Sequence, residues 1–177
     1  MNINEYQNYH ETKAHTSAEF PYNTYLCSIP LDFPGVPLHW HDELELVVIK
    51  RGQGFVSVDF DKRLVHSGDI IIIPPGCLHA IEQDDTFKME YENIIFKPDL
   101  LSSGANDLCM IQYIVPLLDG SLPIEYFLTP ALGSFEALSN CIRQIDLVCA
   151  DQTPGWQLAV KSSLFNFFFL LISERQK

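Results

Sequence analysis

The chain has 177 residues, of which 47% are apolar and 19% are charged. This length buries one substantial core and is too short for two ordinary domains. The 23 acidic residues outnumber the 11 basic ones, and the formal net charge is −12. Because such a surface repels phosphate groups, we do not expect the chain to bind DNA or an anionic membrane by itself.

The cysteines and the apolar runs indicate a soluble cytoplasmic protein with reduced thiols and no membrane partner. The five cysteines are odd in number and widely spaced, and no Cys-x-x-Cys motif occurs, so neither a disulfide framework nor a zinc ribbon is predicted. Residues 1–20 lack an apolar signal core. The longest apolar run, Leu164–Ile172, is about half of the roughly 20 residues that cross a bilayer.

The first 97 residues divide into a polar segment and a β-rich segment. Residues 1–20 are predicted to form a flexible N-terminal arm. Residues 21–97 alternate short β-type runs with Gly and Pro turns, which is typical of a barrel or sandwich. A tight hairpin is expected between Arg51 and Gly54. The expected strands are 24–29, 38–50, 54–60, 63–66, 69–73, 78–82 and 88–96.

Residues 98–177 are predicted to form a linker segment and a helical dimerisation region. From Ser134 to Ala150, apolar residues recur at steps of three and four, which predicts a helix. Thr153 and Pro154 are expected to open a second helix, as its N-cap and first residue, and this helix runs to about Glu174.

The end of the second helix is apolar nearly all round, whereas a surface helix has a single apolar stripe. We expect a second copy of the chain to cover it in a homodimer, because a twofold dimer buries the same patch on both subunits. The alternatives are a helix buried within one subunit and a helix covered by a further region of the protein.

One predicted strand carries a polar face that is unusual for a barrel interior. Alternate residues of a strand point to the same side, so His39, His41, Glu43 and Glu45 share one face. These groups are costly to bury unpaired, which indicates a metal, a polar ligand or a hydrogen-bond network. The intervening Trp40 faces the other side, where we expect it to pack under the C-terminal helices.

A second segment supplies another candidate ligand. Gly68 and the Pro74-Pro75-Gly76 turn bracket a buried strand, and His79 then enters the next strand. If the barrel closes, this imidazole faces the first polar group. The set of three imidazoles and one carboxylate suits a divalent transition metal such as Zn, Ni, Mn or Fe. The candidate metal ligands are His39, His41, Glu45 and His79.

The two segments together resemble the paired motifs of the cupin family. His39 to Gly52 follows the spacing His-x-His, three residues, Glu, six residues, Gly. Gly68 to His79 follows the spacing Gly, five residues, Pro-x-Gly, two residues, His. Two positions depart from the motifs: Gly35 is closer to His39 than usual, and Gln83 stands where Asn is frequent. The resemblance implies a mainly β fold, a cupin double-stranded β-helix or jelly-roll barrel, followed by C-terminal α-helices.

A wider resemblance covers about residues 18–177. The segments Pro37-Leu-His-Trp-His-Asp-Glu43 and Gly68-Asp-Ile-Ile-Ile-Ile-Pro-Pro75, with the Phe- and Leu-rich terminal helices, resemble the N-terminal sensing half of AraC-type transcription regulators. The resemblance implies a cupin that binds a small polar metabolite or sugar, and helices that dimerise. It also implies DNA binding through a separate C-terminal helix-turn-helix region, which is absent from this chain.

The sequence therefore predicts an effector-sensing and dimerisation domain with no catalytic residues. Two alternatives stay open: a metal-dependent cupin enzyme, such as a dioxygenase or sugar isomerase, and a dimerisation module with a vestigial pocket. His10, His15 and His66 are expected to be exposed. The candidate ligand-pocket residues are Tyr25, His39, His41, Glu43, Glu45, His79, Tyr91 and Asn93.

Overall fold

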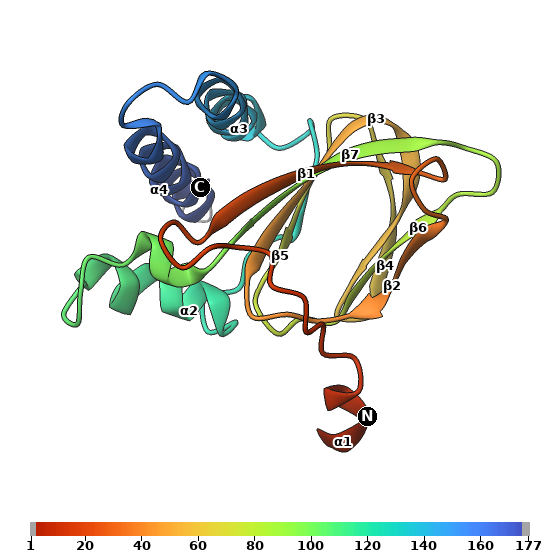
Figure 1. Ribbon diagram of the computed structural model, residues 1–177, viewed down its shortest axis with the longest axis horizontal. Helices are drawn as coiled ribbons and strands as arrows, with labels where there is room; N and C mark the ends of the chain where they lie inside the picture. Colours follow the sequence, from red (N-terminus) through yellow and green to blue (C-terminus); the bar gives the residue numbers. More distant parts are fainter. Residues whose placement is uncertain (1–2, 175–177) are drawn as a thin grey trace. The chain divides into compact units, whose positions relative to one another are not determined.

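Strands dominate the chain as far as Lys97, and helices dominate it from Pro98 onward (Figure 1). The computed structural model describes residues 3–174, so the ends of the predicted arm and helical region, 1–2 and 175–177, lie outside it. The chain divides into two compact units, one ending at Lys97 and the other beginning at Pro98. The finer division of the first unit at residue 20 stays a prediction.

The first unit contains one short helix and seven strands. Their bounds are α1 (Ile3–Gln7), β1 (Tyr22–Ile29), β2 (Gly35–His39), β3 (Leu44–Val58), β4 (Asp61–His66), β5 (Ile70–Ile73), β6 (His79–Gln83) and β7 (Met89–Phe96). The second unit contains a 3-10 turn (Pro98–Leu101), a π-helical turn (Met110–Ile114), α2 (Val115–Leu118), β8 (Phe127–Leu128), α3 (Phe135–Asp151) and α4 (Trp156–Glu174).

The long strand β3 joins the two sheets of the barrel. Its first part pairs with β5 and β7, and β7 pairs in turn with β1. Its second part pairs with β4 and β6, and β6 pairs in turn with β2. All of these pairings are antiparallel, and Figure 1 shows the strands curving around a common interior. The predicted mainly β cupin fold, followed by C-terminal α-helices, is confirmed.

Large apolar side chains are buried on both faces of the strands. All four isoleucines of β5 are buried, as are Leu46 and Val47 of β3 and Phe96 of β7, and successive side chains of a strand point to opposite faces. Each such side chain contributes roughly 1.5–3 kcal/mol when it leaves water. This apolar packing stabilises the strands that carry the polar residues of the site.

Two sequence expectations about β3 are wrong. The predicted strand 38–50 is interrupted by a bend between β2 and β3. The predicted hairpin between Arg51 and Gly54 does not form, because β3 continues through it with a bulge between Ile49 and Arg51. Gly52 instead allows a close approach: its φ is 77°, and an added Cβ would lie 1.8 Å from the carbonyl oxygen of Lys88.

In the second unit, α3 and α4 pack against each other. The predicted apolar face of α3 is buried at Leu138, Ile142 and Ile145. The amide of Asn166 on α4 donates to the sulfur of Cys141, at 3.3 Å. Helix α4 begins at Trp156 and not at Pro154, because Gly155 has a φ of 89° and forms a turn.

By length and composition, helix α4 is long and apolar enough to cross a membrane, because an 18-residue window within it has a mean hydropathy of 1.3. It is longer than the apolar run Leu164–Ile172 because its first turns mix apolar residues with small and polar ones. About 28% of that window is buried. A core helix of a soluble protein meets the same criteria, so α4 is weak evidence for a membrane.

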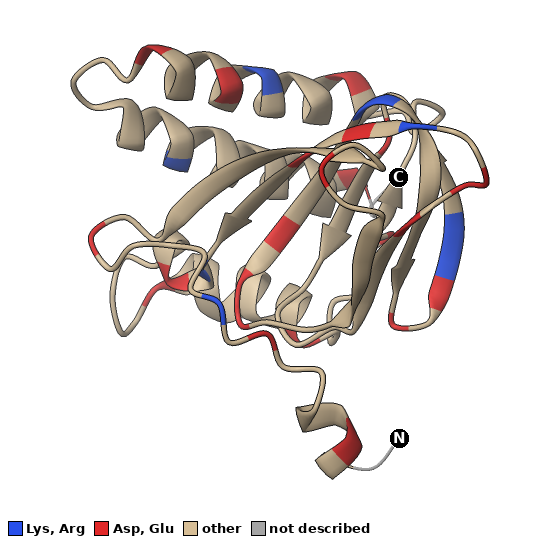
Figure 2. Cartoon of the chain, turned by 45° about the vertical axis from the view of Figure 1, so that its right-hand side comes forward, with Lys and Arg blue, Asp and Glu red and all other residues tan. Residues whose placement is uncertain are grey.

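Acidic residues are spread over both units, whereas basic residues are few (Figure 2). At the edge of the barrel formed by β3 and β4, the basic side chains pair with carboxylates. Lys50 contacts Glu92 at 2.6 Å, and Lys62 contacts Glu82 at 2.5 Å. These pairs leave little free positive charge there to attract a phosphate backbone.

Replacing Gly52 by alanine tests the close approach of β3 to β7. We expect Gly52→Ala to lower the free energy of unfolding by about 2 kcal/mol or more, because the new Cβ meets a backbone carbonyl and φ stays positive. Gly76→Ala is the control, with a φ of 76° and only the Tyr6 hydroxyl at 3.2 Å from its Cβ. Equal losses in urea unfolding would contradict this reading of Gly52.

Candidate functional site

The barrel encloses a cavity of about 290 Å³, within the first unit. Seven of the eight predicted pocket residues line it: Tyr25, His39, His41, Glu45, His79, Tyr91 and Asn93. The N-terminal segment adds three residues that the sequence did not predict, which are Glu11, Lys13 and His15. The cavity wall is therefore made by the barrel and by the segment predicted to be an arm.

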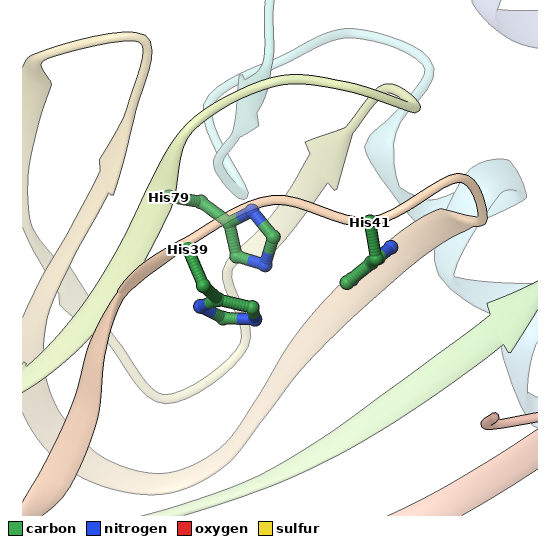
Figure 3. A group of neighbouring side chains, drawn as sticks. All are labelled: His39, His41 and His79. Atoms are coloured by element: carbon green, nitrogen blue, oxygen red, sulfur yellow. The ribbon is translucent and has the colours of Figure 1, made fainter. Parts of the chain in front are cut away.

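Three histidines from the two sequence motifs meet in this cavity. His39 ends β2 and His79 begins β6, and these two residues are direct partners in the sheet register. His41 follows in the bend before β3. One ring nitrogen from each lies within 4.8 Å of the others. Figure 3 shows the three rings directed into the same space, with His39 and His79 adjacent and His41 across from them.

Main-chain carbonyls fix the tautomers of two of these rings. Nδ1 of His39 lies 2.9 Å from the Pro37 carbonyl oxygen, and Nδ1 of His79 lies 2.9 Å from that of Cys77. A carbonyl oxygen only accepts hydrogen bonds, so each Nδ1 carries the proton. Each Nε2 is then the ring nitrogen left to face the cavity. Metal-ligating histidines are held in the same way in proteins.

The carboxylate of Glu45 lies between two imidazoles. Its Oε2 is 3.0 Å from Nε2 of His41 and 3.3 Å from Nε2 of His79, and the side chain is 3% exposed. The His79 nitrogen is buried without a hydrogen bond. When this nitrogen carries no proton, both atoms are acceptors, so a proton or a cation at the nitrogen is needed to make the contact favourable.

A divalent cation fits that requirement. Ligand atoms about 2.1 Å from a tetrahedral or octahedral metal stand about 3.0–3.4 Å from their nearest neighbours. The two contacts of Glu45, at 3.0 and 3.3 Å, have this spacing. The unpartnered nitrogen of His79 and the carbonyl-held tautomers supply the lone pairs. The residues present therefore fit a metal with imidazole and carboxylate ligands.

Charge interactions at the site shift the pKa values of its members. Burial alone would raise the pKa of Glu45, but hydrogen bonding to His41 and the adjacent His79 hold it below its usual value of 4.5. Burial alone would lower the pKa of His41, but the hydrogen bond and charge of Glu45 raise it above 6.5. Burial and the neighbouring His79 lower the pKa of His39. The His41–Glu45 contact is therefore mutually stabilising, because each partner favours the charged form of the other.

Glu43 does not line the cavity, contrary to the sequence prediction. Strict alternation places its side chain beside His41, but the bend between β2 and β3 interrupts the strand at this point. Glu43 is buried, and its Oε2 lies 3.6 Å from Nδ1 of His41. It stands on the ring edge opposite to Glu45, where a carboxylate orients the imidazole.

Trp40 packs against the N-terminal segment, so the expectation that it packs under the C-terminal helices is wrong. Tyr6 stacks on its ring with centroids 4.7 Å apart, and His10 stacks on it at 4.1 Å. The indole nitrogen of Trp40 donates to the carbonyl oxygen of Tyr6 at 2.9 Å. The strand face of Trp40 was predicted correctly, but its covering comes from the other end of the chain.

His15 is also placed differently from the sequence expectation. It is 8% exposed and lines the cavity, with its ring 5.5 Å from that of His41. His10 is half-buried, and His66 is exposed as expected. The sequence did not predict that Glu11 and His15 meet. Residues four apart are neighbours in a helix, but this segment is irregular, so no periodic pattern relates the two.

Comparison with known proteins assigns the family. The family model of the AraC-like ligand binding domain matches residues 25–168. The chain belongs to this family. The matched range includes β2 to β7 complete, most of β1, and the helical unit as far as Phe168 in α4. The resemblance inferred from the two motifs is therefore confirmed.

Two curated regulators are similar to the AraC-like ligand-binding chain. It is 33% identical over 159 residues to the uncharacterized HTH-type transcriptional regulator YdeC of Bacillus subtilis (strain 168), covering 89% of the chain and 54% of the regulator. It is 32% identical over 69 residues to the HTH-type transcriptional activator RhaR of Mannheimia succiniciproducens, covering 39% of the chain and 24% of the activator. The chain spans about half the length of the former.

Solved structures of similar fold were also found. A cupin protein from Bacteroides fragilis is 24% identical, with a TM-score of 0.42, over 50% of the chain and 80% of that protein.

Proposed function

We propose that this AraC-like domain senses a small polar molecule that binds in the barrel cavity. The observation that carries the proposal is a cavity of about 290 Å³ whose wall contains buried polar atoms without partners. They include Oδ1 of Asn93, Nε2 of His79 and Nδ1 of His15. The volume is near the lower end for ligand pockets, which favours a small metabolite or a sugar.

We also propose that His39, His41, Glu45 and His79 hold a divalent transition metal, namely Zn, Ni, Mn or Fe. The fixed lone pairs of two imidazoles and the buried carboxylate support the proposal. When bound, the metal supplies a Lewis-acidic site for a hydroxyl or carboxylate group of the effector. Tyr25, Tyr91 and Asn93 stand around that position as further contacts.

DNA binding is proposed to belong to a helix-turn-helix region outside this chain, in a cytoplasmic protein. The support is the regulator YdeC, of which the chain matches 54%, together with the net charge of −12, which is unfavourable for DNA. The effector would then act by favouring one arrangement of the regulator over another.

A homodimer through the helical unit is proposed as well. Helix α4 exposes large apolar side chains, with Leu158 at 74% and Phe169 at 64% exposed. A largely apolar cavity of about 460 Å³ lies beside Phe169, between the π-helical turn and α4. A second copy of the chain would cover this surface with the same surface of its own.

A metal-dependent cupin enzyme is the alternative function, because a metal held by imidazoles and a carboxylate also suits catalysis. The two functions differ in what happens to the bound molecule. A sensor releases it unchanged, whereas a dioxygenase or isomerase releases a product. Mass spectrometry of the molecule recovered from the protein after prolonged incubation distinguishes them.

Metal binding is tested by elemental analysis and calorimetry of untagged protein. We expect one divalent ion per chain, and His79→Ala should weaken its binding by more than about 100-fold, because a direct ligand exceeds the 10–100-fold effect of an outer-shell group. His66→Ala is the control, since His66 is exposed on β4. Equal binding by wild type and His79→Ala would contradict the site.

Effector binding is tested by a thermal-shift screen of sugars and small carboxylic acids. A compound that binds the cavity at 100 times its Kd should stabilise the protein by about 2.7 kcal/mol. Asn93→Ala should abolish this shift, because it removes a buried acceptor from the cavity wall. Asn140→Ala, exposed on α3, should leave it unchanged. A shift that persists in Asn93→Ala would place the compound elsewhere.

The dimer is tested by light scattering at tens of micromolar protein. We expect wild type to be dimeric and Phe169→Asp to be monomeric, because a charge on α4 opposes burial of the apolar surface. Phe87→Asp is the control, with an aromatic ring 52% exposed on the barrel. A monomeric wild type, or a dimer that survives in Phe169→Asp, would contradict the proposal.

A further inference from the structure

Main-chain hydrogen bonds join the N-terminal segment to the first motif. The amide of Trp40 donates to the carbonyl oxygen of Tyr9 at 3.0 Å, and the amide of Glu11 donates to that of Trp40 at 2.9 Å. Trp40 lies between His39 and His41 in the sequence. This pairing therefore places Glu11 beside both histidines of the motif.

The carboxylate of Glu11 faces the cavity and repeats the arrangement seen at Glu45. Its Oε2 lies 3.6 Å from Nε2 of His39, whose lone pair is exposed because Nδ1 donates to Pro37. An acceptor again faces an acceptor, so a cation beside them would be stabilised by both. The carboxylate is fixed by a second contact, 2.8 Å from Nε2 of His15, which is buried.

The charge of the site favours a second carboxylate. A divalent cation held by three neutral imidazoles and Glu45 carries a residual charge of +1, and the carboxylates of Glu43 and Glu11 each lie 3.6 Å from one of these imidazoles. Glu43 approaches the outer edge of His41 and does not line the cavity, whereas Glu11 does, so Glu11 is the carboxylate placed to contact the cation directly. His15 would orient the added carboxylate from its outer side, as hydrogen-bonded partners of metal ligands do.

We propose that Glu11 is a further metal ligand, supplied by the N-terminal segment, so that metal binding and docking of this segment stabilise each other. The inference rests on the metal site proposed above. The segment has its own anchor on the barrel, since Tyr6 stacks on Trp40 and its hydroxyl donates to the Gly76 carbonyl at 2.6 Å. Because the coupling is a free energy shared by two events, each event strengthens the other by the same factor.

The choice of metal gives a readout that a purely structural role of Glu11 would not change. Zn²⁺ is satisfied by four ligands, whereas Mn²⁺ prefers six and favours carboxylate oxygens. In calorimetric titrations of apo protein, Glu11→Gln should weaken Mn²⁺ binding at least tenfold and Zn²⁺ binding less. Glu19→Gln is the control, because it removes the same charge from an exposed position of the segment. Equal Mn²⁺ affinity in wild type and Glu11→Gln would overturn the proposal.

Docking of the segment is measured by trypsin cleavage after Lys13, which is exposed and is the first basic residue of the chain. Added Mn²⁺ should slow this cleavage at least tenfold in wild type and leave it unchanged in Glu11→Gln. Tyr6→Ala releases the anchor and keeps the carboxylate, so it should weaken Mn²⁺ binding. Cleavage of wild type that is insensitive to Mn²⁺, or full Mn²⁺ affinity in Tyr6→Ala, would overturn the coupling.

The same titrations separate this inference from the proposed metal site. If folded wild type binds neither ion, the metal site fails and the role of Glu11 fails with it. If wild type and Glu11→Gln bind Mn²⁺ equally while His79→Ala does not bind, the metal site stands and only the role of Glu11 is wrong. Selective loss of Mn²⁺ affinity in Glu11→Gln supports both.

Discussion

A buried carboxylate that faces a lone pair is the constraint around which the barrel interior is arranged. Glu45 is 3% exposed, and its Oε2 lies 3.3 Å from Nε2 of His79. Two such acceptor atoms need a proton or a cation beside them, and the proposed metal would supply the cation. Glu43 lies at the other edge of His41, with its Oε2 3.6 Å from Nδ1.

The N-terminal segment extends this constraint beyond the barrel strands. It brings a second carboxylate, Glu11, against the lone pair of His39, and it closes the cavity wall with His15. The segment is attached at Trp40, in the middle of the His-x-His motif, by ring stacking and by main-chain hydrogen bonds. The motif therefore has two faces with different tasks: one holds the polar site, and the other holds the segment that covers it.

Membership of the AraC-like ligand-binding family gives this chemistry a sensing context. A sensor and a metalloenzyme can share one fold, so the function depends on the site and not on the barrel that carries it. What distinguishes a sensor is that occupancy must alter another part of the molecule. The N-terminal segment contacts both the cavity and the barrel surface, and the proposed binding of Glu11 to the metal would make its docking depend on what the cavity holds.

The sequence by itself determined the β fold, the family and the residues His39, His41, Glu45 and His79. His39, His41 and Glu45 lie within seven residues and His79 follows a Pro-Pro-Gly turn, so the local geometry of strands and turns indicates the direction of each side chain. The tertiary structure alone decided the placement of Glu43, the covering of Trp40 and the presence of Glu11 and His15 in the wall. The bend between β2 and β3 keeps Glu43 out of the cavity wall. The contacts of Trp40, Glu11 and His15 join segments about thirty residues apart in the chain. Such contacts depend on folding and leave no periodic pattern in the sequence.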